Sequence, residues 1–425
     1  MSSSSRPLRI GIFVSMFPQV SETFIVTKLL KLLDAGFDVH VFAMAESPHW
    51  DRFAVLAGRD DVRARVHLVP PIERRPRALA RGARSLGAAA ITSPGSFARY
   101  LAHNWRSRHE TNHGFLKSLY LRTPFVGMDL DVLHIEFDAQ GLGIADLKEY
   151  LHCHVLYSAR GTFQQLSVLD TKPDACAYLF RYADGYHVIS RFLENNTRAL
   201  GLPSDVPVWL IEPAIDLSLF QPRPRPVRAP GERLRVISVG RLSWEKGYEF
   251  ALDAIARALR AGVDLDYTIY GAGPFREPVA YAIRQLGLES RVTLAGAVRR
   301  EDMPAVYGQA DMMIHAALAE GFCNAVVEAQ AMEIPVVTSD SGGLPENVED
   351  GVTGFVVPRR DADAMAARIV ELARSPELRQ RMGRAGRQRA LSRFDLDRQA
   401  EAFVRLYREL ASRPRRPVKL HDREL

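Results

Sequence analysis

The sequence predicts an α/β protein built of two doubly wound domains, and three observations lead to this prediction. Short apolar runs rich in β-branched residues alternate with amphipathic stretches of helix length. Such alternation is typical of βαβ units, in which parallel sheets carry helices on both faces. The series of strands starts again after Pro226. The chain of 425 residues also exceeds the ~150 residues of an ordinary domain.

Each half of the chain supplies its own strands. In the first half we expect strands at Leu8–Val14, Val39–Ala43, Val132–Ile135, Val155–Ser158 and Tyr186–Ile189. In the second half we expect them at Leu234–Val239, Tyr267–Tyr270, Val292–Leu294, Met312–Ile314, Pro335–Thr338 and Phe355–Val357. Among the helices between and after them, the sequence predicts Tyr248–Leu259, a helix that starts within Glu320–Asn324, and a final helix at about Leu396–Leu410.

A stretch rich in proline and arginine separates the two series of strands. It predicts a linker at 216–233, between an N-terminal domain at 1–215 and a C-terminal domain at 234–392. The final helix and a basic tail occupy 393–425. No repeat of about 20–50 residues is visible, which argues against a solenoid.

Composition excludes several classes of protein. The chain is 47% hydrophobic and 25% charged, as globular proteins are. A mean hydropathy of -0.11 and the lack of an apolar run near ~18 residues argue against a membrane-spanning helix. The start carries no apolar signal segment, which predicts a cytoplasmic protein. Cys153, Cys176 and Cys323 lie far apart with no CxxC pair, which predicts reduced thiols and no zinc framework.

The net charge of +6 leaves several anionic partners open. Much of the basic character gathers at 59–108, where arginines mix with Leu, Ala, Phe, Tyr and Trp. This segment is either a solvated helical insertion or a basic amphipathic surface that meets anionic lipid or an anionic acceptor. No recognised RNA module surrounds it, so we expect no nucleic-acid partner. Lysine is scarce among the 56 basic residues, so a lysine within a motif is an unusual choice.

Ligands of open parallel sheets bind beyond the carboxyl ends of the strands. After the strand Leu234–Val239 come Gly240, Arg241 and Lys246. Glycine lets a backbone approach a ligand, while a guanidinium fork and an ammonium together suit a diphosphate. The alternative is that Arg241 pairs with Glu245 on the surface.

Two glycine-rich turns follow neighbouring strands of the second half. They are Gly271-Ala272-Gly273-Pro274 and Ser341-Gly342-Gly343. Such turns either let a ligand approach the backbone or simply make a tight turn before a helix.

Two glutamates flank the start of a predicted helix. Glu320 and Gly321 come just before its N-terminus, which favours phosphate. Glu328 lies further along, about 12 Å away if the whole interval is helical. One acid would therefore meet a sugar at the mouth of the helix, and the other would reach a ribose.

In this order, these segments resemble the retaining glycosyltransferases of family 4, which have the GT-B fold. The resemblance rests on Gly240-Arg241-Leu242…Lys246-Gly247, Gly271-x-Gly273-Pro274, Glu320-Gly321-Phe322…Glu328-Ala329 and Gly342-Gly343-x-Pro345-Glu346. The two glutamates match the E-x7-E motif of the family. In the first half, Phe17–Ile25 is similar to the opening motif of members that build exopolysaccharide and cell-surface glycans. Pro213–Asp216 with Phe220 is similar to a segment that follows the domain crossing.

The resemblance implies two Rossmann-like domains that face a cleft, with a C-terminal helix that crosses back to the N-terminal domain. It implies a retaining hexosyltransferase without metal or other cofactor, cytoplasmic or peripheral at the inner face of the membrane. The donor would be a nucleotide-diphosphate sugar such as a UDP- or GDP-sugar, and the acceptor a glycan or a lipid-linked oligosaccharide. The implied catalytic residues are Arg241, Lys246 and Glu320. The implied donor-binding residues are Gly240, Gly271, Gly273, Gly321, Phe322, Cys323, Asn324 and Glu328. The acceptor-side candidates are Ser21, Glu22, Thr23, His134 and Arg160.

Two of the acceptor-side candidates have competing interpretations. Many relatives carry a histidine at the position of Arg160, so the role of that histidine does not transfer, and Arg160 is either part of the site or one side of a surface ion pair. His134 ends a strand and is either an acceptor contact or a structural histidine.

Two further patterns contain residue types that bind metals, but neither predicts a metal site. In His152-Cys153-His154, period-two alternation places both histidines on one strand face without a third ligand nearby. Asp-Leu-Asp occurs at 129–131, 264–266 and 395–397, which we interpret as turns and helix starts.

Three other functions stay open on the sequence alone. The chain could be a GT-B phosphorylase or a nucleotide-sugar epimerase, and an epimerase would change the sugar without an acceptor. It could be a non-catalytic protein that binds nucleotide-sugars. A nucleic-acid binder is the third, and its affinity would fall steeply with salt.

Overall fold

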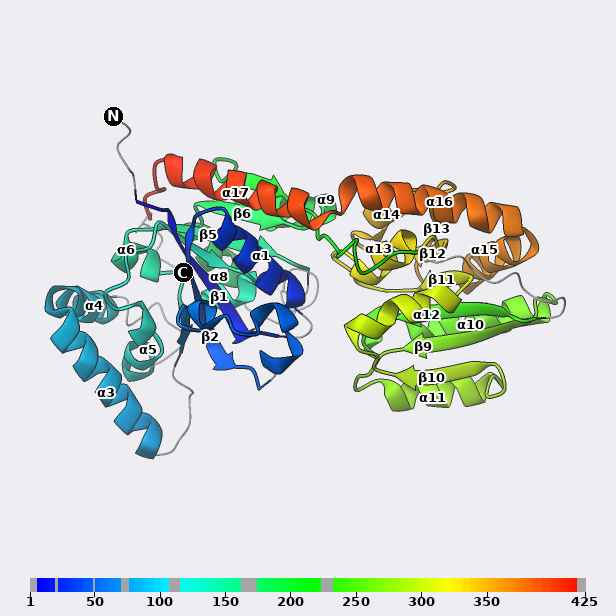
Figure 1. The fold of residues 1–425 in the computed structure, drawn as a ribbon, viewed down its shortest axis with the longest axis horizontal. Coiled ribbons are helices and arrows are strands. Elements are labelled where there is room, and N and C mark those ends of the chain that lie inside the picture. Colours follow the sequence, from blue (N-terminus) through cyan, green and yellow to red (C-terminus); the bar gives the residue numbers. More distant parts are fainter. Residues whose placement is uncertain are drawn as a thin grey trace. The chain divides into compact units, whose positions relative to one another are not determined.

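The computed structural model describes residues 6–19, 22–48, 50–69, 76–106, 115–161, 174–222 and 232–418. The chain forms two compact units, each with its own sheet (Figure 1). The first unit contains residues 1–189, 194–211 and 400–425, and the second contains 190–193 and 212–399. No helix within the described ranges is both long and apolar enough to cross a membrane.

The first unit holds a parallel sheet of seven strands in the order β3-β2-β1-β4-β5-β6-β7. The strands are β1 (Arg9–Phe17), β2 (Asp38–Glu46), β3 (Val66–Leu68), β4 (Val132–Ile135), β5 (His154–Ala159), β6 (Gly185–Val188) and β7 (Val208–Leu210). Its helices are α1 (Thr23–Asp34), α2 (Asp60–Arg63), α3 (Pro76–Thr92), α4 (Pro94–Arg106), α5 (Phe115–Leu121), α6 (Leu147–Leu151) and α8 (Asp174–Tyr182). Two more helices, α9 (Arg191–Ala199) and α17 (Leu396–Ser412), have most of their residues in this unit.

The second unit holds a parallel sheet of six strands in the order β10-β9-β8-β11-β12-β13. The strands are β8 (Leu234–Val239), β9 (Leu265–Tyr270), β10 (Val292–Gly296), β11 (Met312–His315), β12 (Val336–Ser339) and β13 (Gly354–Val357). The helices are α10 (Tyr248–Arg260), α11 (Arg276–Gln285), α12 (Met303–Gln309), α13 (Asn324–Ala331), α14 (Leu344–Asn347), α15 (Ala362–Arg374) and α16 (Pro376–Arg393). Helix α10 packs with α15, and α13 packs with α16 (Figure 1).

The predicted α/β class with two doubly wound units is confirmed. In each sheet the chain adds its first three strands in one direction and then adds the remaining strands on the other side of the first strand. This reversal of strand order lies between β1 and β4 in one unit and between β8 and β11 in the other. This reversal is the topological switch point at which such sheets bind ligands. The final helix returns to the first unit as expected, and its residues Phe403, Leu406 and Tyr407 are buried in that core.

The structure contains two strands that the sequence did not predict, and it corrects the placement of His152 on a strand. The edge strands β3 and β7 were not predicted, and β3 lies within the segment 59–108 that we expected to be an insertion. His152 has a φ of 52° and ends α6, while β5 starts only at His154. The two histidines therefore do not share a strand face, because a turn separates them. Parts of the basic segment and of the predicted linker, 70–75, 107–108 and 223–231, lie outside the described residues.

Candidate active site

The candidate site lies at the carboxyl ends of β8 and β11, the two strands at the switch point of the second sheet. The loop after β8 continues through a short turn at Trp244–Lys246 into α10, where Gly247 adopts a φ of 60°. The backbone N–H of Leu318 donates a hydrogen bond of 2.7 Å to the carbonyl of Glu245, which joins this loop to the one after β11. The two loops therefore hold their side chains in one place.

The glycines of this region serve contacts between loops. Gly271 has a φ of 151°, and a Cβ there would lie 1.8 Å from the carbonyl oxygen of Gly240. Gly342 has a φ of 57°, and its Cβ would lie 2.0 Å from the carbonyl oxygen of Glu320. Both positions require glycine because backbone occupies the space of any side chain. That these turns also approach a ligand stays a prediction.

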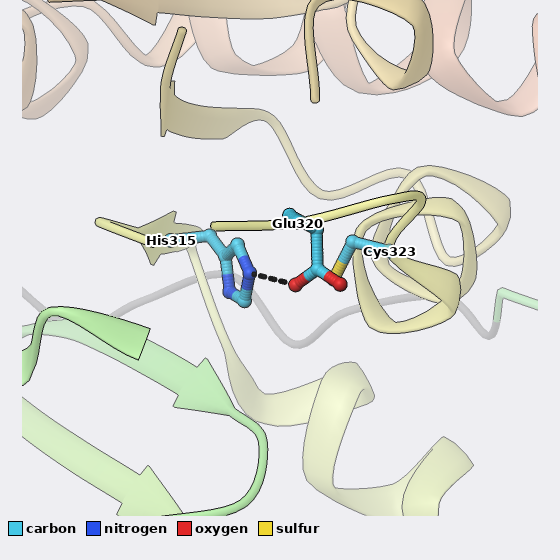
Figure 2. A group of neighbouring side chains, drawn as sticks. All are labelled: His315, Glu320 and Cys323. Carbon is cyan, nitrogen blue, oxygen red and sulfur yellow. Dashed lines mark hydrogen bonds and ion pairs between the residues drawn. The ribbon is translucent and has the colours of Figure 1, made fainter. Parts of the chain in front are cut away.

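Lys246, His315 and Glu320 form a charged cluster between the two loops. The Lys246 ammonium donates to Glu320 Oε2 at 2.5 Å, and His315 Nε2 lies 3.1 Å from the same oxygen. The side chains of Lys246 and Glu320 are 14% and 13% exposed, and that of His315 is 4% exposed. Figure 2 shows the Glu320 carboxylate between the His315 ring and the Cys323 thiol.

The cluster keeps all three groups in their charged forms. Burial acts to raise the pKa of Glu320, but Lys246 and His315 outweigh it and lower the pKa to about 2. Burial acts to lower the pKa of His315, yet its interactions with Cys323 and Glu320 raise it to about 9. Burial opposes the charge of Lys246 as well, and Glu320 nevertheless raises the pKa of that ammonium. The site therefore holds a permanent carboxylate that two cations share.

Helix α13 begins beside this cluster. Its N-cap, Cys323, makes no side-chain cap hydrogen bond, so the N-terminal N–H groups of the helix keep their capacity for an anion. The backbone N–H of Cys323 itself donates to Asn347 Oδ1 at 3.1 Å. Gly321, Phe322 and Cys323 are buried, whereas Asn324 is exposed.

Glu328 lies one turn into α13. Because the helix begins only at Asn324, the rise of about 12 Å expected between Glu320 and Glu328 does not apply. The Tyr307 hydroxyl donates to Glu328 Oε2 at 2.9 Å. Burial raises the pKa of Glu328 to about 7, in spite of this bond and of the nearby Arg300. Nothing in the sequence pointed to Tyr307, which comes from α12.

Arg241 pairs with Glu245 and not with the acid of the charged cluster. Its side chain is 67% exposed and pairs with Glu245 at 3.2 Å, which is the surface arrangement we had weighed as the alternative. The Glu245 carboxylate also accepts a hydrogen bond of 2.6 Å from the Ser243 hydroxyl. An exposed guanidinium on a rigid loop is free to change partner at little cost.

Glu346, from the last glycine-rich segment, has a structural contact of its own. Its carboxylate accepts hydrogen bonds of 2.8 Å from the backbone N–H groups of Arg191 and Phe192, in the first turn of α9. An acid at that position stabilises the helix N-terminus.

The acceptor-side candidates lie in the first unit, and their surroundings differ. Ser21 lies outside the described residues, and Thr23 begins α1. Burial raises the pKa of Glu22 to about 7, against the opposing effect of Arg160. Arg160 donates to the Glu136 carboxylate at 2.7 Å and stacks 4.0 Å over the Phe24 ring. With a side chain only 13% exposed, Arg160 forms a buried ion pair and not the surface pair we had considered.

His134 is a structural residue. It has no exposed surface, and its Nδ1 and Nε2 lie within hydrogen-bond distance of the Tyr407 hydroxyl (2.6 Å) and the Ser158 hydroxyl (2.7 Å). Ser158 is in turn 2.7 Å from His187 Nδ1. A ring whose two nitrogens are both engaged inside the core has nothing to offer an acceptor, so the structure favours a structural role for His134 over an acceptor contact.

The charged cluster is also the place where a metal is conceivable. Among the described residues, His315, Glu320 and Cys323 each offer a donor atom, and these atoms lie within 4.8 Å of one another. Nitrogen, oxygen and sulfur ligands suit zinc. However, the Lys246 ammonium already occupies the Glu320 oxygen that His315 shares, so a metal would have to displace a cation. The residues thus fit the ammonium better than a metal, and metal independence stays a prediction.

Residues 221–389, which contain the whole candidate site, match the family described as Glycosyl transferases group 1. The colanic acid biosynthesis glycosyltransferase WcaL of Salmonella typhimurium is 27% identical over 394 residues, covering 86% of this chain and 91% of that protein. The amylovoran biosynthesis glycosyltransferase AmsK of Erwinia amylovora is 26% identical over 376 residues, with coverage of 86% and 91%.

Solved structures agree on the fold. A sucrose-phosphate synthase from Thermosynechococcus elongatus superposes with a TM-score of 0.68 at 19% identity, covering 95% of this chain and 99% of that one. Anabaena HepE, solved in complex with UDP-glucose, gives a TM-score of 0.68 at 16% identity, covering 95% and 100%. Residues 221–389 therefore match the Glycosyl transferases group 1 family, and the chain is a glycosyltransferase with the GT-B fold.

Proposed function

We propose that this glycosyltransferase moves a sugar from a nucleotide-diphosphate sugar to a glycan or a lipid-linked oligosaccharide, with retention of configuration and without a metal. We further propose that it serves the synthesis of exopolysaccharide or another cell-surface polysaccharide. The names of WcaL and AmsK, which align over most of their length with this chain, support the pathway class. The complex of HepE with UDP-glucose supports the donor class.

The observation that carries this proposal is the ion pair of Lys246 with Glu320 beside the start of α13. In our proposal, the diphosphate takes over the Lys246 ammonium and accepts hydrogen bonds from the N-terminus of α13. Arg241 turns from Glu245 to the same group. These donors stabilise the charge that grows on the leaving phosphate as the glycosidic bond breaks. Glu320, released from Lys246 and still beside His315, then accepts hydrogen bonds from sugar hydroxyls.

Glu328 is suited to the ribose. One of its oxygens accepts from Tyr307, which fixes the side chain and leaves the other oxygen for a ribose hydroxyl. Hydrogen bonds from hydroxyl groups favour the ionised carboxylate, so donor binding would lower the raised pKa of Glu328.

The surroundings of Glu320 bear on how configuration is retained. After the diphosphate has taken over Lys246, His315 still acts to lower the pKa of Glu320 and sugar hydroxyls occupy its oxygens, so Glu320 is poorly suited to remove a proton from the acceptor hydroxyl. We therefore propose attack on the face from which the diphosphate leaves, with the leaving phosphate as the base.

We also propose that the enzyme works in the cytoplasm, at the inner face of the membrane. Helices α3 and α4 carry exposed apolar side chains among their arginines, including Ile91 (83% exposed) and Leu101 (38% exposed). Flotation with anionic vesicles tests this proposed membrane contact. The variant Ile91→Ser/Leu101→Ser is expected to float less well than the wild type.

The central experiment combines donor screening with removal of the ion pair. A true donor raises the melting temperature by mass action, so thermal shift against UDP-, GDP- and other nucleotide-sugars identifies it. Lys246→Ala then abolishes transfer. Because that change leaves the mostly buried Glu320 without its partner, Lys246→Ala/Glu320→Ala, which removes both charges, controls for stability.

Normal turnover by either folded variant would contradict the proposal. Donor binding without turnover on any acceptor would instead favour a non-catalytic binding protein. A sugar that changes in the absence of an acceptor would favour an epimerase, and a need for inorganic phosphate would favour a phosphorylase.

A further inference from the structure

A cavity of about 530 Å³ lies in the first unit, at the ends of the strands opposite to those that the candidate acceptor residues follow. Leu8, Asp131 and His154 line it, and these residues stand at the amino ends of β1, β4 and β5. Glu22 and Arg160 follow the carboxyl ends of β1 and β5. The cavity is therefore separate from the acceptor side of this unit.

The walls of the cavity carry more positive than negative charge. Arg6 is neutralised by Asp129 and Asp131, at 3.3 and 3.0 Å. Arg99 of α4 and Arg415, which follows α17, also line the cavity. Within the described part of the chain neither has a carboxylate at ion-pair distance, and the one hydrogen bond recorded for Arg99 goes to the Ser96 hydroxyl. Two guanidinium groups are thus left without an anion.

His154 contributes a buried polar atom to the same wall. Its side chain is 8% exposed, and its Nδ1 has no hydrogen-bond partner among the residues placed by the structure. The nearest carboxylate oxygen, Asp184 Oδ1, is 4.0 Å away. That oxygen already accepts from Lys148 Nζ at 2.8 Å and from the backbone N–H of Arg416 at 2.7 Å. Buried polar groups nearly always have a partner, so the free Nδ1 calls for one from outside the chain.

We propose that this cavity binds a phosphate-bearing ligand, which Arg99 and Arg415 hold and to which His154 donates from Nδ1. A phosphate group offers several acceptor oxygens and matches the planar fork of arginine, which makes charge-assisted bonds to it. The volume exceeds that of a single phosphate and leaves room for the group to which the phosphate is attached. This site is additional to the proposed donor site, which lies in the other unit.

The test uses inorganic pyrophosphate as the probe, in calorimetric titrations of the full chain. Arg99→Gln/Arg415→Gln is expected to weaken one binding event by about tenfold or more, as loss of two charge-assisted contacts implies. Both arginines are exposed, so this variant should fold normally. Arg84→Gln/Arg405→Gln removes two exposed arginines outside the cavity and serves as the matched control.

A further variant separates this proposal from the proposed function. Arg241→Ala/Lys246→Ala is expected to retain the event that Arg99→Gln/Arg415→Gln loses, because it changes only the second unit. Equal isotherms for the cavity variant and its control would overturn the proposal, even if donor binding in the second unit were normal.

A second arm asks where the phosphate comes from. Vesicles of phosphatidylcholine with and without phosphatidic acid replace pyrophosphate. If the cavity variant floats less well than the control only with phosphatidic acid, the ligand is a lipid headgroup. If the two variants float equally but differ in pyrophosphate binding, the ligand is a soluble phosphate compound.

Discussion

Each unit contains a cluster of one lysine, one glutamate and one histidine, in which the histidine lies in β4 or β11 and the glutamate follows that strand, and the two clusters differ in what covers them. In the first unit Lys28 pairs with Glu136, and His134 of β4 lies 3.6 Å from the same carboxylate. In the second unit the set is Lys246, Glu320 and His315 of β11. Strands β4 and β11 occupy the same place beside the switch point of their sheets.

The first set is sealed, whereas the second is open on one side. The side chains of Lys28 and Glu136 are 3% and 0% exposed, against 14% and 13% for Lys246 and Glu320. Phe403 of α17 covers Lys28 at 4.6 Å, and Arg160 closes the other side of Glu136. The same three residue types therefore build an internal scaffold in one unit and the proposed ligand site in the other, and access to solvent separates the two roles.

The largest expected effect on stability comes from breaking the sealed pair. Glu136→Gln breaks the buried ion pairs of this carboxylate with Lys28 and Arg160, which should lower the free energy of unfolding by ~3–5 kcal/mol. Urea denaturation measures it. Glu320→Gln should cost less stability, because solvent reaches Lys246, and yet abolish most turnover. If Glu136→Gln has the same free energy of unfolding as the wild type, the buried set does not have the structural role that we assign to it.

The next effect concerns turnover alone. Arg241→Ala should lower kcat by roughly 10²–10³-fold, the range found when one donor to a developing charge is removed. Its melting temperature should not change, because the side chain is 67% exposed. Arg299→Ala is the matched control, since Arg299 is 79% exposed and also pairs with a nearby acid, Asp302. Equal loss in both variants would show a general effect of charge.

Glu320 and Glu328 should contribute to stability with opposite dependences on pH. The pKa of Glu320, about 2, lies below its usual 4.5, so its contribution to stability is present above pH 4.5 and is lost as the pH falls toward 2. The pKa of Glu328, about 7, lies above 4.5, so its contribution is present below pH 4.5 and is lost as the pH rises toward 7.

Urea titrations at a series of pH values check both signs. Glu320→Gln should remove the acid slope and Glu328→Gln the slope between pH 4.5 and 7. A variant that keeps the slope assigned to it would contradict the corresponding assignment.

The smallest expected effect is that of metal removal. Dialysis against EDTA should leave turnover unchanged, because in our proposal Lys246, Arg241 and the N-terminus of α13 supply the positive charge that a metal would otherwise bring to the diphosphate. Loss of turnover that added Zn²⁺ restores would instead assign a metal to His315, Glu320 and Cys323.

Much of the fold follows from local sequence patterns. Strands such as β4 and β8 appear at the predicted residues because long apolar runs between turn residues leave little choice. The edge strands β3 and β7 have only three residues each, too few to show a period, and neighbouring strands rather than local preference hold them in place.

The candidate site was predictable in its residue types and less so in its contacts. Glu320 and Lys246 stand in motifs, and the structure joins them directly. The partnership of Tyr307 with Glu328 links two helices that are distant in the sequence, which no local pattern encodes. For His134 the local pattern was misleading. Its position at a strand end suggested an acceptor contact, but the side chain is fully buried and contacts Tyr407 of α17, a helix that is distant in the sequence.

The path of α17 has a consequence for the order in which the protein is made. Four buried residues of the first unit's core, Phe403, Leu406, Tyr407 and Leu410, are synthesised only after residues 212–399. At ~5–20 residues per second, that interval lasts on the order of 10–40 s. The second unit can complete its core during this time, whereas the first must wait on the ribosome with part of its apolar surface uncovered. The half of the chain that is translated first is therefore the last to finish folding, and it is the half that most needs the help of a chaperone.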